Sequence, residues 1–186
     1  MKRKDFIKRA CFSGTCLCGF GSLLLAGEGS ADPGRSEEGN NDRQDLIQEW
    51  VANLLTNMNK GLDEESIRKV MKKCAVVHYN NLRMDDILTG YTGNLEAFMK
   101  FLEEKWGWKI QWDAAAKTLI ADENKDYCVC PMVNREKDMK SAALCYCSEG
   151  FAEMMFGRVI DGPATATVIS SIQRGDKSCK YKVTFS

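Results

Sequence analysis

The sequence has 186 residues, of which 44% are apolar and 28% are charged. This is the length and mixture of one globular domain that can bury a hydrophobic core. The 26 basic side chains are balanced by 26 acidic ones, so the positive charge typical of nucleic-acid-binding proteins is absent. We therefore expect a small ligand or a protein as partner, and no nucleic acid.

The N-terminus has the pattern of an export signal. Residues 2–9 are cationic, and residues 10–27 form an apolar segment rich in Gly, Ser and Cys. A small-residue cleavage site follows, with Gly29 two positions before Ala31. The apolar segment is short and weakly hydrophobic for a membrane span, although an uncleaved anchor is the alternative. We predict an export signal peptide (1–31), a flexible linker (32–42) and a single domain (43–186), in the periplasm or cell envelope.

The start of the chain resembles the twin-arginine export motif. Arg3 and Lys4 stand at the two basic positions, Phe6 follows after a spacer, and Lys8 closes the motif. The resemblance departs from the motif at Lys4, where the second arginine is expected. It implies export of a protein that is already folded, often with its cofactor inserted. We expect contact with the membrane only through the export signal.

Helices are predicted in the first half of the domain. Residues 42–61 have apolar side chains at helical spacing. The predicted apolar face of this helix carries Leu46, Ile47, Trp50, Val51, Leu54 and Met58. A second helix over 63–81 begins with Asp63 as N-cap. Its predicted inward face carries Ile67, Val70, Met71, Cys74, and Val77 or His78, so that Cys74 and His78 lie one turn apart. A third helix is predicted over 94–106, ending at Gly107.

Strands are predicted in the second half. Residues 108–112 and 117–122 alternate between apolar and polar side chains and form a hairpin. Residues 126–131 are predicted as a third strand, in which Cys128 and Cys130 point to the same side.

A polar loop (134–141) leads to a predicted helix with Ser148 as N-cap. This places Cys147 just before a helix N-terminus, where backbone N–H groups stabilise a thiolate. Two last strands follow in 163–172 and 178–185, with Cys179 facing inward. The sequence therefore predicts an α+β fold with N-terminal helices, a mainly antiparallel sheet, one helix between strands and a C-terminal hairpin.

Soft metal ligands concentrate at predicted inward or helix-end positions. They are Cys74, His78, Cys128, Cys130, Cys145, Cys147 and Cys179. Thiolates and an imidazole suit zinc or an iron–sulfur cluster. Two alternatives stay open, because an exported protein with an even number of cysteines is also suited to disulfides, and cysteine is often a buried free thiol. The metal hypothesis predicts that these seven residues lie together in space.

Other chemical signals are few. The sequence contains no metalloprotease, phosphate-binding-loop, dinucleotide-binding or serine-hydrolase motif. Glu149 and Glu153 fit helix capping or a solvated helix face. The tryptophans fit a core, or less readily a pocket wall; they are Trp50, Trp106, Trp108 and Trp112.

From Met71 onward the chain resembles a cysteine-rich bacterial family of unknown function. Its pattern runs C-G-x-x-C-A, C-x-C-P, C-x-C-S-x-G-aromatic and S-I-x-x-G-D-x-x-C-x-aromatic. The matching stretches here are residues 74–78, 128–131, 145–151 and 171–181. Ala75 and His78 replace a Gly and a Cys of the pattern. Histidine binds the same metals, so the replacement is compatible with a metal site.

The C-terminal helix and hairpin are more remotely similar to 4-vinyl reductase-type ligand-binding domains and to L-2-amino-thiazoline-4-carboxylic acid hydrolase-like proteins. The first resemblance implies a zinc site, but only Cys179 matches its ligands, since Val168 and Ser171 stand at the other two positions.

The sequence thus favours an exported protein that binds zinc or an iron–sulfur cluster, with a small apolar ligand beside it, for sensing, binding or redox chemistry. The alternatives are a hydrolase or reductase that uses Cys147, and a disulfide-stabilised binding module.

Overall fold

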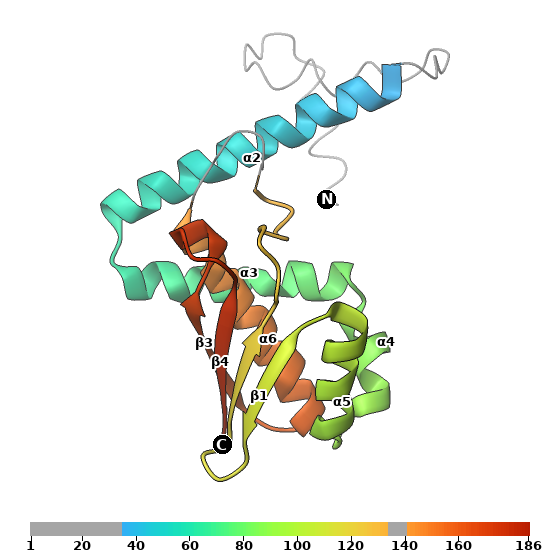
Figure 1. Cartoon of the computed structure of the whole chain (residues 1–186). Coiled ribbons are helices and arrows are strands. Elements are labelled where there is room, and N and C mark those ends of the chain that lie inside the picture. Colours follow the sequence, from blue (N-terminus) through green and yellow to red (C-terminus); the bar gives the residue numbers. More distant parts are fainter. Residues whose placement is uncertain (1–34, 134–140) are drawn as a thin grey trace, which may run out of the picture. The chain divides into compact units, whose positions relative to one another are not determined.

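The computed structural model describes residues 35–133 and 141–186 (Figure 1). The chain divides into two compact units, residues 1–40 and 41–186, and the fold below is that of the second unit. No helix among the described residues is long and apolar enough to cross a membrane.

The predicted export signal lies outside the described residues, and so does the predicted polar loop except for its last residue, Ser141. The predicted linker is described in part, and it is helical from Arg35 onward.

Helix α2 (Arg35–Gly61) buries a different face from the one that the sequence predicts. Gln48 and Leu55 are buried, and Val51 and Met58 are half-buried. The Gln48 side chain donates a hydrogen bond to the carbonyl oxygen of Pro131 over 2.9 Å. The prediction was wrong for four apolar residues that are 41–64% exposed, namely Leu46, Ile47, Trp50 and Leu54.

Helix α3 (Glu64–Asn81) begins as predicted. The Asp63 carboxylate caps it by accepting a hydrogen bond from the Ser66 backbone N–H over 2.9 Å. The inward face is partly different from the prediction. The buried side chains are Ile67, Met71, Ala75 and Tyr79, whereas Val70, Cys74 and Val77 are exposed.

The segment between α3 and the sheet supplies much of the aromatic core. It contains α4 (Met84–Leu88), the turn η2 (Thr89–Tyr91), α5 (Leu95–Phe101) and the π-helical turn η3 (Leu102–Trp106). Only the last two were predicted, as one helix. Gly107 ends this helix with a φ of 72°, in the left-handed region that favours glycine.

The sheet is four-stranded and antiparallel, in the order β1-β2-β4-β3. The strands are β1 (Lys109–Asp113), β2 (Thr118–Asp122), β3 (Ala164–Ser170) and β4 (Lys180–Phe185). This confirms the α+β class and both predicted hairpins. The third strand predicted over 126–131 is wrong: this segment has no strand, because β2 already pairs with β1 on one side and β4 on the other.

Helix α6 (Cys145–Ile160) packs against one face of the sheet, and α3 packs on α6 (Figure 1). Tyr181, Val183 and Phe185 of β4 alternate with exposed residues and form the buried side of the strand, as predicted. Gly150 allows α3 and α6 to approach closely. A Cβ at this position would overlap the backbone carbonyl of Lys72.

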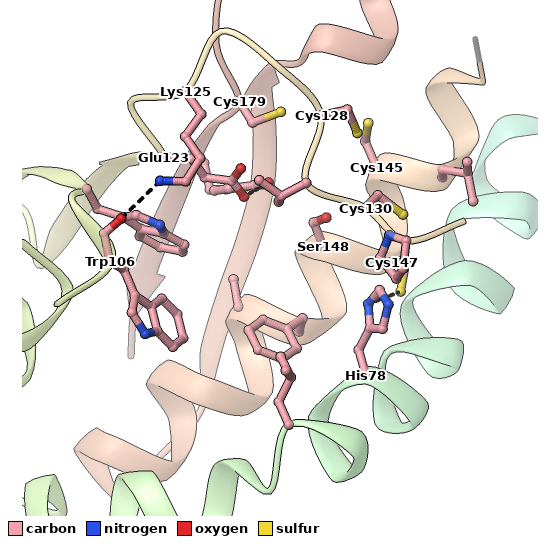
Figure 2. Close-up of a pocket in the computed structure, with 18 of the residues that line it drawn as sticks. His78, Trp106, Glu123, Lys125, Cys128, Cys130, Cys145, Cys147, Ser148 and Cys179 are labelled. Carbon is pink, nitrogen blue, oxygen red and sulfur yellow. Dashed lines mark hydrogen bonds between the residues drawn. The ribbon is translucent and has the colours of Figure 1, made fainter. Parts of the chain in front are cut away.

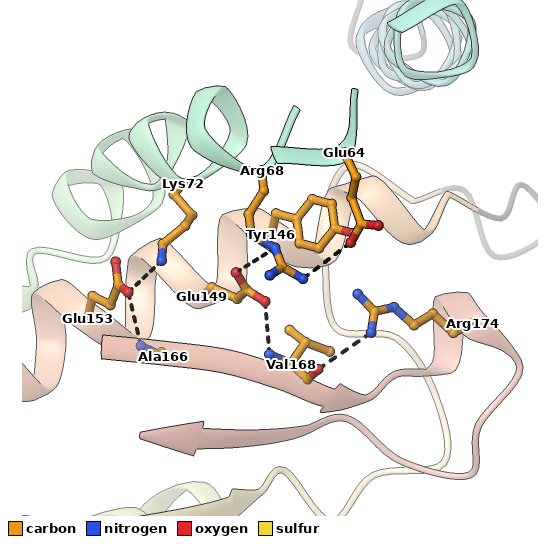
Figure 3. Close-up of polar contacts among 9 residues, drawn as sticks. All are labelled: Glu64, Arg68, Lys72, Tyr146, Glu149, Glu153, Ala166, Val168 and Arg174. Atoms are coloured by element: carbon orange, nitrogen blue, oxygen red, sulfur yellow. Dashed lines mark hydrogen bonds and ion pairs between the residues drawn. The ribbon is translucent and has the colours of Figure 1, made fainter. Parts of the chain in front are cut away.

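A network of charged side chains joins α3, α6 and β3 (Figure 3). The carboxylates of Glu149 and Glu153 accept hydrogen bonds from the backbone N–H groups of Val168 and Ala166, each over 2.9 Å. The Nε atom of Arg68 lies 3.5 Å from a carboxylate oxygen of Glu149, which makes an ion pair. The geometry is too poor for a hydrogen bond, and this buried Nε has no hydrogen-bond partner among the described residues.

Lys72 lies 2.5 Å from Glu153. Glu149 is 1% exposed, so the prediction that it caps a helix or faces solvent was wrong.

Candidate functional site

A cavity of about 780 Å³ lies between α3, η3, the start of α6 and the sheet. Its walls are mainly apolar. Aromatic side chains from three different elements form much of this lining, and they are Trp106, Trp108, Phe151 and Tyr181. Two of the four tryptophans therefore line a cavity, whereas Trp50 and Trp112 are 64% and 38% exposed.

One end of the cavity is lined by thiols (Figure 2). Cys128 and Cys130 lie on the irregular segment that follows β2, Cys145 and Cys147 lie on the first turn of α6, and Cys179 directly precedes β4. The imidazole of His78 joins them from α3. Six of the seven predicted ligands thus border one cavity. We call the region of Cys128, Cys130, Cys145, Cys147 and His78 the thiol end; Cys179 lies between it and Glu123.

Cys74 is the exception, because it is exposed and does not line the cavity. The prediction that it faces inward was wrong. Helix α3 is rotated so that Ala75 and Tyr79 take the inner face, and the Tyr79 hydroxyl donates a hydrogen bond to the Asp85 carboxylate over 2.8 Å.

Two contacts orient the thiols of α6. The Cys145 sulfur lies 3.1 Å from the hydroxyl oxygen of Ser171, and the Cys147 sulfur lies 4.0 Å from Nδ1 of His78. The six cysteines of the described residues, Cys74 included, are all free thiols. As these side chains lie, no group of three or more His, Cys, Asp or Glu residues in the described ranges is arranged to hold a metal ion.

Burial disfavours the thiolate form of four of the thiols. It raises the pKa of Cys147 to about 11 and the pKa values of Cys130 and Cys179 to about 12, and it also raises the pKa of Cys145. The prediction that Cys147 is a stabilised thiolate just before a helix N-terminus was wrong. This residue lies inside the helix instead, because α6 begins at Cys145 and Ser148 is not its N-cap.

Polar groups lie on the other side of the cavity, near Trp106. The Tyr181 hydroxyl donates a hydrogen bond to the Glu123 carboxyl over 2.6 Å, and both side chains are buried. The Lys125 ammonium donates one to the carbonyl oxygen of Trp106 over 3.2 Å. Burial raises the pKa of Glu123. The Tyr181 hydrogen bond and the Lys125 charge lower this pKa, but their effect is smaller than that of burial. We call Glu123, Lys125 and Tyr181 the polar end.

Sequence reasoning missed the polar end. Glu123 follows β2 by one residue, and its backbone N–H continues the strand pairing by donating to the carbonyl oxygen of Cys179 over 3.0 Å. An acidic residue just after a strand usually signals a turn, so only the strand order reveals that Glu123 lies beside Cys179 and Tyr181.

The fold and the cavity define a class: an α+β domain with a mainly apolar, cysteine-lined cavity. The chain belongs to a family of unknown function, DUF6144, which matches residues 34–186. No curated protein matches the sequence. The predicted resemblances to 4-vinyl reductase-type and thiazoline hydrolase-like domains stay predictions.

A solved structure with a similar fold is that of a trafficking protein particle complex subunit 3 from Naegleria fowleri, covalently bound to palmitic acid. The TM-score is 0.50 and the sequence identity is 11%, and the match covers 78% of this chain and 96% of that chain. At this identity the likeness concerns the fold.

Proposed function

We propose that this domain binds a small, mainly apolar molecule in its cavity. The observation that carries the proposal is the cavity itself, which has a volume of about 780 Å³ and apolar and aromatic walls. Ligand pockets of proteins typically measure roughly 300–1,000 Å³ and combine such walls with a few polar groups. A protein of similar fold has been crystallised with covalently bound palmitic acid, which supports an apolar ligand here as well.

Binding of the neutral dye N-phenylnaphthylamine, followed by its fluorescence, tests this proposal. Ser148 is half-buried and lines the cavity, so Ser148→Phe fills part of the space without replacing a core residue. We expect this variant to weaken dye binding by about ten-fold or more, which is about 1.4 kcal/mol.

The matched control is Thr167→Phe, on the exposed side of β3, which should leave dye binding unchanged. Equal dye binding by both variants, with circular dichroism spectra like that of the wild type, would contradict the proposal.

A second proposal concerns the thiol end, where we infer a site for zinc or an iron–sulfur cluster. Five thiols and one imidazole from four segments of the chain border the same cavity. These groups are the preferred ligands of both. Side-chain rotations are needed to bring four of them into tetrahedral contact with one ion, and loading would displace the thiol protons.

The predicted export signal adds a reason for a bound metal. Free thiols in an oxidising compartment tend to form disulfides, whereas metal-bound thiolates are protected from doing so. The predicted twin-arginine route would deliver the domain to the periplasm or cell envelope with its metal already bound.

Metal content and free thiols of the purified full chain, prepared without a metal-affinity tag, test the second proposal. We expect about one zinc per chain, or iron with the absorption of a cluster, together with thiols that react only after chelation. Cys128→Ser combined with Cys145→Ser should abolish metal binding. Cys74→Ser, an exposed position outside the cavity, should not. A metal-free protein with all its thiols reactive would refute the site.

The alternative of a hydrolase or reductase with Cys147 as nucleophile has less support. A thiol with a pKa of about 11 is almost fully protonated at neutral pH, and the thiolate is the nucleophile. Loss of a measured turnover in Cys147→Ser, with ligand binding retained, would restore the enzyme hypothesis.

A further inference from the structure

The polar end of the cavity is built differently from the rest of the lining. Glu123 and Tyr181 are 8% and 5% exposed, in surroundings that are otherwise apolar. Burying polar groups this deeply is costly unless they are hydrogen-bonded. One carboxyl oxygen of Glu123 accepts the Tyr181 hydroxyl. The other has no hydrogen-bond partner among the described residues and is not fully enclosed by protein atoms.

Lys125 also has hydrogen-bond donors that no described residue accepts. An ammonium group has three donors, and the Trp106 carbonyl takes one of them. Lys105, which is exposed, adds a further positive charge to the cavity lining. The cavity lining therefore carries two ammonium groups and a single carboxyl group.

The positive charge of the lining has no matching number of acids. Lys105 and Lys125 are set against Glu123 alone, and one carboxyl oxygen of Glu123 already accepts from Tyr181. The lining thus offers ammonium donors beside aromatic walls.

We propose that the ligand is an apolar carboxylic acid, whose carboxylate is bound by Lys125 and whose apolar part lies along Trp106 and Trp108 toward the thiol end. In Figure 2, Trp106, Glu123 and Lys125 stand on one side of the cavity, and Cys130, Cys147 and His78 stand on the other. The proposal rests on the proposed function of the cavity and specifies the class of its ligand.

Calorimetric titration of the full chain with decanoate, decanol and decylamine tests the proposal, because the three probes share one apolar chain and differ in the head group. A charge-assisted hydrogen bond in a partly buried site favours the acid over the alcohol by about ten-fold or more. We expect Lys125→Met to remove this preference while decanol binding stays the same.

Lys182→Met is the matched control, since Lys182 lies on the exposed side of β4 and outside this cavity. It should keep the preference for the acid. Glu123→Gln should keep it as well, because the amide oxygen still accepts from Tyr181 and Lys125 is unchanged.

The outcomes separate the two proposals. Equal affinity for all three probes, or a preference for decylamine, would overturn the carboxylate proposal and leave the apolar cavity in place. No binding of any probe, together with no binding of the neutral dye, would overturn both.

Discussion

The two sides of α6 hold their polar groups in opposite ways. Toward α3 and β3, the carboxylates of Glu149 and Glu153 each have a cationic partner and a backbone N–H donor. Toward the cavity, the described residues give Cys147 a contact of 4.0 Å to His78 and Cys145 one of 3.1 Å to the Ser171 hydroxyl, and neither thiol has a charged partner. The first arrangement uses most of the hydrogen-bonding capacity of its groups, whereas the second leaves capacity unused. The difference separates a structural side of the helix from a side that is able to bind.

The largest effect is expected on the structural side, from Glu149→Ala. The substitution leaves the Val168 N–H without its acceptor and removes one of the two acidic partners of Arg68, which keeps its pair with Glu64. Loss of one member of a buried ion pair costs about 3–5 kcal/mol, and we expect the lower end because Arg68 is 36% exposed. Urea unfolding measures the change. Glu104→Ala, in an exposed pair with Lys100, should change stability by less than about 0.5 kcal/mol. A similar small change for Glu149→Ala would mean that the two sides of α6 do not differ.

Gly150→Ala tests the close contact of α6 with α3. The added methyl group would meet the backbone of Lys72, which cannot move aside as a flexible side chain does. We expect a loss of about 1–3 kcal/mol, although alanine is the better helix former. Gly90→Ala, where a methyl group meets nothing within 4 Å, is the control for thermal unfolding. Equal melting temperatures of the two variants would contradict the packing.

Glu123→Gln addresses the cavity side through pH. Burial raises the pKa of Glu123 above its ordinary value of 4.5, so the folded state favours the protonated form. The wild type should then lose stability relative to Glu123→Gln as pH rises from about 4.5 to the folded-state pKa. The slope is at most about 1.4 kcal/mol per pH unit. Urea unfolding from pH 4 to pH 8, at roughly unit steps, measures the difference. A difference between the two proteins that does not change with pH would show that burial does not affect this carboxyl group.

The smallest expected effect is a difference in thiol reactivity, which does not involve the stability of the fold. Alkylation by iodoacetamide, resolved by peptide mass spectrometry, measures the rate at each cysteine. Cys147, with a pKa of about 11, and Cys130, with a pKa of about 12, should react slowly at pH 8, and their rates should still rise at pH 10. The exposed Cys74 should react first. Faster reaction of Cys147 than of Cys74 at neutral pH would indicate an activated thiol and favour the enzyme hypothesis.

Local signals predicted much of the fold, because they act over a few residues. The Asp63 cap, the stop at Gly107 and the two hairpins were all found from neighbouring residues. The faces of the helices were harder to predict, since α2 and α3 carry apolar side chains on more than one side. On α3, two contacts select the buried face: the Lys72 backbone meets Gly150, and the Tyr79 hydroxyl bonds to Asp85. Gly150 is distant in sequence and Asp85 is not apolar, so the apolar pattern of α3 reveals neither contact.

The candidate site was predicted in part for the same reason. Cysteine content pointed to the thiol end, and six of the seven residues do border one cavity. The prediction for Cys74 was wrong because it depended on the rotation of α3. The polar end was missed because Glu123 and Tyr181 are far apart in sequence and meet through the pairing of β2 with β4.

The glutamates of α6 also affect where a strand of another molecule can add to the sheet. β3 is an edge strand, and an edge strand with free N–H groups is a template for a strand of another molecule. Because Glu149 and Glu153 already occupy the N–H groups of Val168 and Ala166, a foreign strand would have to displace two carboxylates that also hold Arg68 and Lys72. Intermolecular strand addition is therefore directed away from β3 and toward β1, at the opposite edge.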